Sequence, residues 1–519
     1  MHDVVVVGGG FGGLSAARTL ARGGADVVLC ETLSYLGGCA STFSRSVDGV
    51  ACQFESGATL FSGLGPEGYF TRRLQQDGVS DVTFSLLDPV IELRTPSLSL
   101  RVPSNRADFD TAILALPGAP RGTERFLRLQ RSVAEALWPL FDDVTLLPPF
   151  SARMLVAHAR RLGAYLPLAT TIGRSVRSVM AAHDVDGWAP LRSLLQGLCQ
   201  ITVQTDINHA EAPFALAAVD YPFRGTGHVN GGVSRLADAL ALGITRAGGE
   251  VRRGHRVQRV EPVTHGHRVL TKHGDLMARH VILNMLPDDA ASLCGVPLAA
   301  ETARLAARVR EGWSAVMLYL LIDDDVAFGD DAHHLELVDN DDEAFVEGNH
   351  VFVSVCARGD GHAPAGLRAA TVSTHVALST MRRLDADGDT GEAVAAIQTR
   401  MRNLVGKRAP ELRIMASMTA SPRTWQRFVG RSGGAVGGAP RTAGLGAYRG
   451  LGPTRLSPQH PTLWLVGDSV FPGQSTLATS VGGERLASTL LQHLGLGCPR
   501  PPDDGIAASR RQGYQNVSR

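Results

Sequence analysis

The chain has 519 residues, and its 51 lysines and arginines nearly balance its 50 aspartates and glutamates, so its formal net charge at pH 7 is +1. This length is too great for one compact core and predicts two domains, and the balanced charge provides no net field to attract nucleic acid, which we do not expect as a partner. The longest apolar run, Trp313 to Ile322, is about half as long as a membrane-spanning helix and is typical of a buried strand. We therefore expect any contact with a membrane to be peripheral.

The cysteine pattern argues against disulfides and against a metal site. The seven cysteines are scattered, no two form a C-x-x-C pair, and none clusters with histidine at the spacing of metal ligands. The first strand begins almost at once, which leaves no room for a cleavable signal peptide. We expect a cytoplasmic protein with reduced thiols and no bound metal. The cysteines are Cys30, Cys39, Cys52, Cys199, Cys294, Cys356 and Cys498.

The first strand and the turn after it carry a dinucleotide-binding pattern. Val4 to Val7 is an unbroken β-branched run, typical of a strand with both faces covered. The glycines that follow have G-x-G-x-x-G spacing, which lets the backbone approach a pyrophosphate and lets the next helix pack closely on the strand. The turn residues expected to bind the dinucleotide are Gly8, Gly9, Gly10, Phe11, Gly12 and Gly13.

A helix from about Leu14 to Arg22 and a second strand from Asp26 to Cys30 complete this unit. The helix directs its free N–H groups and the positive end of its dipole at the pyrophosphate. The strand leads to Glu31, at the distance from the turn where a carboxylate accepts hydrogen bonds from ribose hydroxyls. An acid at this position favours an adenine dinucleotide without a 2′-phosphate.

Two further glycine motifs carry a resemblance to a known family. They are Gly37 to Thr42, which contains Gly38 and Cys39, and Phe54 to Thr59, which contains Gly57 and Ala58. With the first turn and its acid, L-G-G-C-A-S-T and F-x-x-G-A-T resemble the FAD-binding start of the phytoene desaturase family of flavoproteins, which includes carotenoid isomerases and retinol saturases. The resemblance implies FAD contacts at these four residues, although a plain turn is the alternative for the glycine pair. Many members have Arg or Lys where this chain has Cys39, so one charge contact is missing.

The segment after these motifs predicts a substrate domain. Short apolar stretches from residue 78 to 116, the last being Thr111 to Leu116, alternate with turns and predict a small antiparallel sheet. Apolar spacing predicts a helix from Glu124 to Leu140. Phe150 to Met180 mixes leucines with arginines, which is typical of an interfacial amphipathic helix and equally of a helical cap with a solvated basic face.

The middle of the chain predicts a return to the cofactor domain. Gly225 to Gly232 is a glycine-rich loop that contains His228 and leads into a helix, and Glu250 to Arg253 then reads as a strand. In the resembling family the next run contacts adenine through its backbone, which implies such a contact at Val257. Val281 to Leu286 predicts a further buried strand.

The second half predicts a helix, several strands and a loop before the chain closes. Ala303 to Trp313 and Ala393 to Arg408 predict helices, and Ala315 to Ile322, Val351 to Cys356 and Ala370 to His375 predict strands. The glycine-heavy stretch from Ser421 to Gly438, which contains Arg431, is similar to a loop of the family, and the alternative is a linker. The tail from Pro499 to Arg519 has little apolar content and predicts disorder.

The closing segment carries the second sharp signal. An apolar strand from Leu463 to Val466 ends in Gly467 and Asp468, and a helix follows to Leu494. The carboxylate can hold the ribityl hydroxyls of a flavin, and the amino-terminus of the helix can face the flavin pyrimidine oxygens. The expected cofactor contacts here are Gly467, Asp468, Ser475, Thr476 and Leu477.

Together these signals predict an α/β fold. We expect a discontinuous, Rossmann-like FAD-binding domain of the glutathione-reductase type, with a mostly parallel sheet, and an α+β substrate domain with an antiparallel sheet and a helical cap. The FAD-binding domain is expected at residues 1–77, 227–298 and 455–496. The substrate domain is expected at 78–226 and 299–454, with 150–180 as a possible membrane-facing cap and 497–519 as a disordered tail.

Within the family, several stretches look most like the carotenoid 3,4-desaturases. They are Gly37 to Thr42, Gly57 to Phe61, Gly225 to Gly232, and Phe352 to Ser354 with Ala363 and Pro364. This resemblance implies FAD-dependent introduction of a double bond into an acyclic carotenoid, lycopene-derived or 1-hydroxylated. No NAD(P) motif appears, since the second G-x-G-type stretch, Gly225 to Gly232, follows no clear strand, and this favours oxygen or a quinone as the electron acceptor.

Desaturation of an unactivated C–C bond removes a hydride and a proton. Glu55 and His228 are candidates to accept the proton and Arg431 or Arg224 to stabilise charge, although each has a structural role as its alternative. Three other functions stay open: a carotenoid cis–trans isomerase that uses reduced FAD, a different saturase-like oxidoreductase acting on a polyene or retinol, and a non-enzymatic prenyl-binding escort protein.

Overall fold

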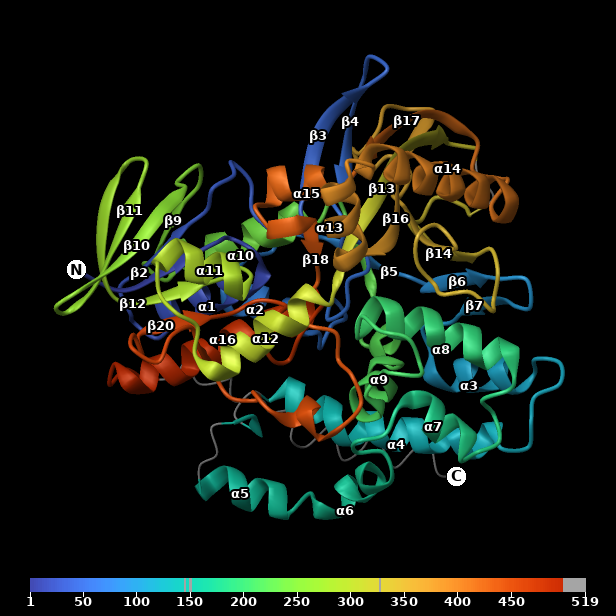
Figure 1. Cartoon of the computed structure of the whole chain (residues 1–519), viewed down its shortest axis with the longest axis horizontal. Helices are drawn as coiled ribbons and strands as arrows, with labels where there is room; N and C mark the ends of the chain where they lie inside the picture. Colours follow the sequence, from blue (N-terminus) through green and yellow to red (C-terminus); the bar gives the residue numbers. More distant parts are fainter. Residues whose placement is uncertain (144–145, 149–151, 326–327, 498–519) are drawn as a thin grey trace.

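The computed structural model describes residues 1–143, 146–148, 152–325 and 328–497, and it confirms the predicted α/β fold. Two large sheets organise the chain (Figure 1). The first, on the left of the view, contains strands from the beginning, the middle and the end of the chain, and the second contains strands from the segments between them. Cys498 and the tail predicted to be disordered lie outside the described residues.

The first sheet is built on five parallel strands in the order β20-β12-β1-β2-β9. Val4, Val5 and Val6 of the central strand have no exposed surface, which explains why this run has no polar break. β10 and β11 continue the first half of β12 as an antiparallel extension, and β19 pairs with β20. The strands are β1 (His2–Val7), β2 (Val27–Cys30), β9 (Glu250–Arg252), β10 (Val257–Val263), β11 (Gly266–Thr271), β12 (Gly274–Leu283), β19 (Thr454–Arg455) and β20 (Leu463–Leu465).

Close packing of the first and last helices joins the two ends of the described chain. A Cβ atom on Gly483 would lie only 2.1 Å from the carbonyl oxygen of Gly12, so the two backbones touch where α16 crosses α1. This crossing brings the turn after β1 and the start of α16 to the same edge of the sheet. The helices around the first sheet are α1 (Phe11–Arg22), α2 (Tyr69–Gln76), α10 (Ser234–Arg246), α11 (Pro287–Cys294), α12 (Ala300–Arg310) and α16 (Thr476–His493).

The second sheet is mostly antiparallel, in the order β17-β13-β16-β15-β14-β6-β7, with β18 paired to β13. Only the β6–β14 pair among these is parallel. Leucine and valine side chains of β13 to β16 pack against α14 in one apolar cluster. The strands are β6 (Ile91–Arg94), β7 (Ser99–Val102), β13 (Trp313–Asp323), β14 (His333–Val338), β15 (His350–Val355), β16 (Leu367–Ala377), β17 (Ile414–Ala420) and β18 (Ala435–Val436).

The prediction of a separate small sheet at residues 78–116 is wrong. β6 and β7 form the edge of the second sheet, and β5 (Phe84–Leu86) pairs instead with β8 (Gly227–Val229). The stretch from Thr111 belongs to a helix, α3 (Arg106–Leu114), whose first N–H groups are capped by the side chain of Asn105. The cap and the one-sided burial of Phe109 and Ile113 outweigh the apolar alternation that suggested a strand.

The stretch from Ser421 to Gly438 is also more ordered than the predicted loop. It contains α15 (Pro422–Val429), which begins with a reciprocal capping box between Ser421 and Thr424 and ends at Gly430 in the left-handed conformation. The remaining outer elements are the β3 (Thr42–Val47) and β4 (Val50–Glu55) hairpin and the helices α13 (Leu378–Asp387) and α14 (Thr390–Arg408).

A helical layer lies below the second sheet in Figure 1. The helix predicted from Glu124 to Leu140 is present as α4. The segment from 152 to 181 forms short helices, of which α5 and α6 lie at the bottom of the view. None of the helices in the described ranges is both long and apolar enough to cross a membrane. The helices of this layer are α3, α4 (Thr123–Asp142), α5 (Ala152–Ala159), α6 (Leu162–Tyr165), α7 (Val176–Ala181), α8 (Ala189–Thr202) and α9 (Ala212–Ala218).

Candidate functional site

A cavity of about 1130 Å³ lies between the two sheets and is lined by segments from the whole length of the chain. Its wall includes Val7 and Cys30 at the carboxyl ends of two parallel strands, and Met317 and Ser373 of the second sheet. Sites for one small ligand usually enclose about 300–1,000 Å³. The volume of this cavity is above the upper end of that range.

The glycine turn after β1 forms a part of the wall that has no space for side chains. Gly8 has a φ of +104°, and a Cβ atom on Gly10 would lie 2.8 Å from Nδ2 of Asn284. A Cβ atom on Gly13 would lie 2.2 Å from the carbonyl oxygen of Gly8. The turn thus presents bare backbone and the amino-terminus of α1 to the cavity, which is the arrangement that binds a pyrophosphate.

Glu31 is held at the end of β2 by the backbone around it. One carboxylate oxygen accepts a hydrogen bond of 2.7 Å from the N–H of Gly9, and the other accepts one of 2.7 Å from the N–H of Leu33. The side chain lines the cavity, and burial raises its pKa. A carboxylate has about four acceptor positions, so Glu31 can still accept hydrogen bonds from a ligand.

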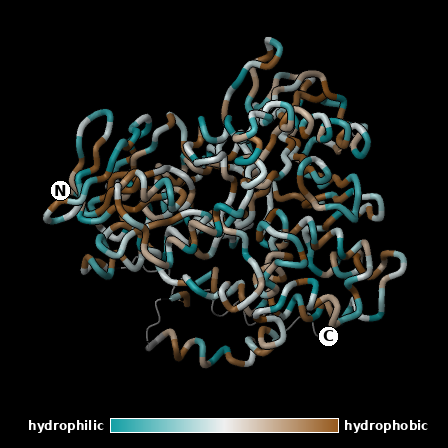
Figure 2. Tube along the Cα trace, in the orientation of Figure 1, coloured by the Kyte–Doolittle hydropathy of each residue, from teal (hydrophilic) through white to brown (hydrophobic). Residues whose placement is uncertain are grey.

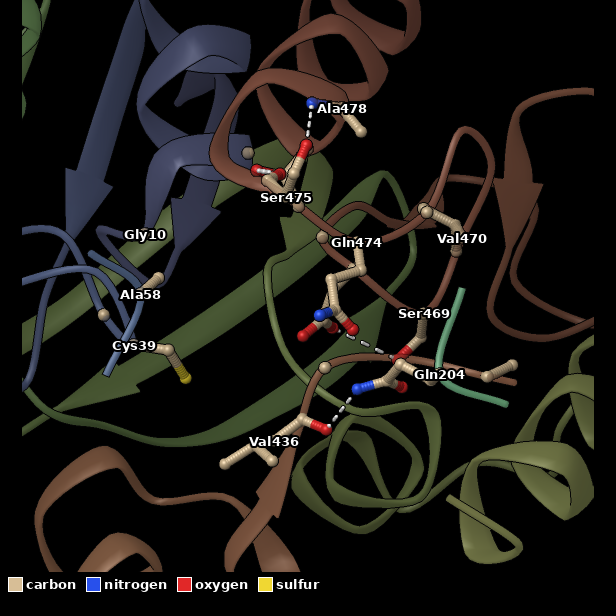
Figure 3. Close-up of a pocket in the computed structure, with 18 of the residues that line it drawn as sticks. Gly10, Cys39, Ala58, Gln204, Val436, Ser469, Val470, Gln474, Ser475 and Ala478 are labelled. Carbon is tan, nitrogen blue, oxygen red and sulfur yellow. Dashed lines mark hydrogen bonds between the residues drawn. The ribbon is translucent and has the colours of Figure 1, made fainter. Parts of the chain in front are cut away.

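The two sequence motifs after β2 form one wall of the cavity. Figure 3 shows Gly10, Ala58 and Cys39 on this wall, facing Gln474 and Gln204 across the space. Burial raises the pKa of the Cys39 thiol, while the cation of Arg431 acts in the opposite direction. Arg431, from a different segment of the chain, therefore places a positive charge close to Cys39.

Arg431 and Asp468 form a mostly buried ion pair on the cavity wall. The guanidinium Nη2 lies 2.9 Å from Asp468 Oδ2 and Nη1 lies 3.3 Å from Oδ1, so each nitrogen contacts one carboxylate oxygen. Arg431 Nε also donates to the carbonyl oxygen of Ala435. This arrangement fixes the orientation of the Asp468 carboxylate.

The amino-terminus of α16 opens onto the same region. Its N-cap, Ser475, has a φ of +106°, and its hydroxyl oxygen accepts a 3.0 Å hydrogen bond from the N–H of Ala478 (Figure 3). Thr476 and Leu477 line the cavity next to it. The positive end of an eighteen-residue helix is thus directed at the cavity.

Most of the residues predicted to contact the cofactor line this cavity. The exceptions are Gly9, which binds Glu31, and Gly13, which packs against Gly8. Those that line the cavity are Gly8, Gly10, Phe11, Gly12, Glu31, Gly38, Cys39, Gly57, Ala58, Val257, Gly467, Asp468, Ser475, Thr476 and Leu477.

The three residues predicted as catalytic lie in two different places. Arg431 lines the cavity, whereas Glu55 and His228 do not. Glu55 accepts hydrogen bonds from the N–H of Val233 and from the side chain of His362, and the ring of His228 lies 2.8 Å from Asp360. The structure therefore brings Glu55 and His228 into one buried polar cluster outside the cavity lining.

Sequence reasoning missed the far end of the cavity, which is aromatic. Trp138 and Phe141 of α4 meet Phe214 of α9 and Phe471, with ring centroids 5.7 to 6.4 Å apart. The guanidinium of Arg441 lies 3.4 Å from the centroid of the Phe214 ring. These residues come from four separate segments without a shared local motif.

The second sheet contributes a further missed wall that contains histidines. His350 and Phe352 of β15 and His375 of β16 line the cavity. Neither nitrogen of His350 makes a hydrogen bond with any described residue, and burial lowers its pKa to about 3. The alternation along β15 and β16 is the signal that could have placed these side chains on one face.

Buried neutral histidines predict that acid destabilises the fold. Burial lowers the pKa of His334 and His350 to about 3 and that of His375 to about 4, whereas the unfolded value is about 6.5. Between these values the unfolded chain binds more protons, so stability rises with pH and falls as the pH decreases below about 6.5. Each such histidine adds up to about 1.4 kcal/mol per pH unit to the slope of the unfolding free energy against pH.

We expect His334→Phe to flatten this slope by about that amount between pH 6 and pH 5. The measurement is the urea unfolding free energy at pH 7, 6 and 5. The exposed residue His265 offers the matched control, and His265→Phe is expected to leave the slope unchanged. An identical slope in wild type and His334→Phe would contradict the prediction.

Comparison with known proteins supports the fold and the dinucleotide end of the site. Residues 6–76 match the NAD(P)-binding Rossmann-like domain family. The solved structure of an oxidoreductase from Methanosarcina mazei superposes with a TM-score of 0.61 at 17% identity, covering 93% of this chain and 98% of that one. Putrescine oxidase bound to putrescine gives a TM-score of 0.60 at 16% identity, covering 95% and 99%. The chain thus has a Rossmann-like dinucleotide-binding domain within the fold of these proteins.

A more specific similarity extends over nearly the full sequence. The chain is 24% identical over 516 residues to the chloroplastic prolycopene isomerase of Daucus carota, which covers 95% of this chain and 81% of the relative. The similarity is distant but extends over most of both sequences.

Proposed function

We propose that this chain is an FAD-dependent oxidoreductase that acts on a carotenoid, a long hydrophobic polyene. The observation that carries the proposal is the continuous cavity, which connects the dinucleotide turn to the aromatic end. The distant similarity to prolycopene isomerase points to the same class of substrate. The fold and the cavity are compatible with both an oxidation and an isomerisation.

The residues present fit FAD at several points. The glycine turn has no space for a Cβ atom at Gly10 or Gly13, which suits a pyrophosphate, and Glu31 and Val257 lie where the adenosine half would bind. Asp468 is oriented by Arg431 at the other end, where a ribityl chain would bind. When bound, FAD supplies a ring that exchanges hydride equivalents with the substrate. The chain itself positions and shields the two ligands.

The far end of the cavity fits a conjugated substrate with a polar terminus. Rings of Trp138, Phe141 and Phe471 offer faces on which a polyene can pack. The Oε1 atom of Gln204 and both ring nitrogens of His350 lack a hydrogen-bond partner among the described residues, and a pure hydrocarbon would leave them without one. This arrangement supports a 1-hydroxylated acyclic carotenoid, and we propose desaturation at C-3,4 as the reaction, with oxygen or a quinone as the electron acceptor.

A second candidate is cis–trans isomerisation on the same scaffold with reduced FAD. It is favoured by the similarity to prolycopene isomerase over most of both sequences. Neither candidate uses Glu55 or His228 for proton transfer in our proposal, because neither residue lines the cavity.

Expression in bacteria that accumulate lycopene or its 1-hydroxylated derivatives tests the proposal by pigment chromatography and mass spectrometry. A product two hydrogens lighter, with absorption at longer wavelength, indicates desaturation. A product of unchanged mass with altered cis–trans composition indicates isomerisation. Unchanged pigments together with a purified protein that is colourless and does not bind added FAD would refute both candidates.

We also propose that the segment from 152 to 181, called here the cap segment, docks on a membrane surface. Part of it packs inward, since Met154 is buried, but large apolar side chains remain exposed. A hydrogen bond from the N–H of Gly444 to the carbonyl oxygen of Gly173 places Leu445 beside the segment. Ala443 and Gly446, on either side of Gly444 and Leu445, line the cavity. Figure 2 shows hydrophobic and hydrophilic residues alternating along the segment. The exposed apolar residues are Leu155, Val156, Leu162, Leu166, Ile172 and Leu445.

The double variant Leu162→Glu, Leu166→Glu is expected to reduce cosedimentation with anionic liposomes several-fold. Both side chains are more than 60% exposed, and a carboxylate in their place disfavours burial in lipid and is repelled by the anionic surface. Val263→Glu with Met277→Glu changes two exposed apolar residues on β10 and β12 and serves as the control. Equal sedimentation of both double variants and wild type would remove the proposed docking surface.

A further inference from the structure

A buried cluster of potential metal ligands lies outside the cavity, in the connection between β15 and β16. The Sγ of Cys356, a carboxylate oxygen of Asp360 and a ring nitrogen of His362 all lie within 4.8 Å of one another. Cys356 is 4% exposed and His362 is 1% exposed. None of the three lines the cavity. The cluster is therefore separate from the proposed cofactor and substrate site.

The ring of His362 is oriented by a carboxylate on its far side. Its Nε2 lies 3.1 Å from Oε1 of Glu55. Glu55 also accepts hydrogen bonds from the N–H of Val233 and the hydroxyl of Thr42, at 3.0 Å each, so its position is fixed. An Nε2–H that donates to Glu55 leaves the lone pair of Nδ1 free on the side of Asp360. A histidine that binds a metal commonly donates its other N–H to a carboxylate in this way.

When Nε2 carries the proton, the unprotonated Nδ1 on the opposite side of the ring faces a carboxylate oxygen of Asp360, so two acceptors face each other. Nδ1 of His362 lies 2.8 Å from Oδ1 of Asp360, yet it makes no hydrogen bond with any described residue. Two lone pairs at this distance repel each other unless a proton or a metal cation lies between them. The thiol of Cys356 provides a third potential ligand atom at the same point. A proton shared by His362 and Asp360 would not need this third atom, whereas a metal ion would use it.

Asp360 has its own outer support. Its Oδ2 lies 2.8 Å from Nε2 of His228, which leaves Oδ1 directed at His362. The backbone N–H of Gln53 on β4 donates to the carbonyl oxygen of His362 at 2.7 Å. The loop is thus held against β4 and β8, and the three donor atoms converge inside a protein environment rather than at the surface.

We propose that Cys356, Asp360 and His362 bind a divalent transition metal, with zinc the best match to one thiolate, one imidazole and one carboxylate. Four-coordinate zinc accepts this donor set, with water as the fourth ligand, and binding displaces the thiol proton. Glu55 and His228 are positioning residues that orient His362 and Asp360. The ion ties the β15–β16 connection of the second sheet to β4 and β8. None of the three ligands lines the cavity, so the role assigned to the ion is to hold this connection in place and not to take part in the reaction proposed in the cavity.

The competing arrangement is a proton in place of the ion. Burial lowers the pKa of His362, but the Cys356, Asp360 and Glu55 groups raise it by more, so an imidazolium between two carboxylates is the alternative state of the cluster. The two arrangements differ in a direct observable, because only one of them contains a metal.

The test is the metal content of the full-length protein, purified from zinc-supplemented cultures and measured by inductively coupled plasma mass spectrometry. About one zinc per chain is expected in wild type, with near-complete loss in Cys356→Ser and Asp360→Asn. Cys294→Ser replaces another buried cysteine, on α11, and is expected to keep the metal. His228→Asn is expected to weaken metal affinity by about ten- to a hundredfold.

A chelator provides a measurement that does not depend on any variant. Removal of zinc from wild type is expected to lower the melting temperature, and re-addition of zinc is expected to restore it. A folded wild-type protein without stoichiometric metal, or one whose zinc is retained in a folded Cys356→Ser variant, would overturn the site. Flavin content is measured on the same samples, so that failure of the metal site is distinguished from failure of the proposed cofactor site.

Discussion

Asp468→Ala is expected to destabilise the fold by about 3 kcal/mol and to leave the purified protein largely without flavin. The substitution removes the carboxylate that would hold the ribityl chain. It also leaves the Arg431 cation without its ion-pair partner. The two side chains are only 16% and 13% exposed, so water compensates the lost partner poorly. Flavin absorbance per chain and urea unfolding measure the two effects on the same sample.

A double-mutant cycle separates the ion pair from the cofactor contact. Arg431→Met alone is expected to destabilise the fold by a similar amount, and the double variant Arg431→Met, Asp468→Ala by clearly less than the sum of the two. Flavin is expected to be lost in Asp468→Ala and in the double variant alike. Additive effects on stability would show that the pair is not coupled, and full flavin occupancy in Asp468→Ala would remove this residue from the cofactor site.

The two ends of the fold were predictable because their signals are local. Val4 to Val7, the glycine spacing and Glu31 fall within one strand–helix–strand unit, and each residue type follows from burial or from backbone approach. The closing strand and α16 were equally predictable from sequence, since Gly467 and Asp468 directly follow an apolar run. Their meeting at one cavity follows from the parallel order of β20, β12 and β1.

Features that depend on distant partners could not be predicted. β6 and β7 look like a free hairpin, but they complete the second sheet through β14, more than two hundred residues later. The apolar pattern of α3 is weak and resembles that of a strand. Its start is fixed instead by the side chain of Asn105, which caps the first N–H groups of the helix. Both errors arise where tertiary pairing or a single capping residue outweighs local alternation.

The same limit applies to side chains that converge on a site. Glu55 and His362 are more than three hundred residues apart, so no spacing rule connects them, and the sequence favoured the expectation of no bound metal. His350 and Phe141 reach the cavity from a strand and a helix that share no motif. The cofactor half of the site was accessible from sequence, whereas the substrate half required the fold.

Glu31→Ala is expected to weaken FAD binding by about a hundredfold, because hydrogen bonds from ribose hydroxyls to a carboxylate contribute about 1.5–3 kcal/mol each. The same change leaves the N–H groups of Gly9 and Leu33 without their acceptor, which loosens the turn that would hold the pyrophosphate. Glu31→Gln is not a neutral substitute, since its amide NH₂ would face one of these N–H donors. Titration of the flavin-free protein with FAD, followed by fluorescence quenching, gives the dissociation constant.

Glu250→Ala is the matched control for this measurement. Glu250 lies on β9, next to β2, but its carboxylate is exposed and pairs with Arg252 outside the cavity. Its removal is expected to change the dissociation constant by less than about twofold, since exposed ion pairs contribute little. Equal FAD affinity in Glu31→Ala and Glu250→Ala would mean that the acid after β2 does not bind the ribose. The orientation proposed for the cofactor, with adenosine at Glu31 and flavin at Asp468, would then have to be abandoned.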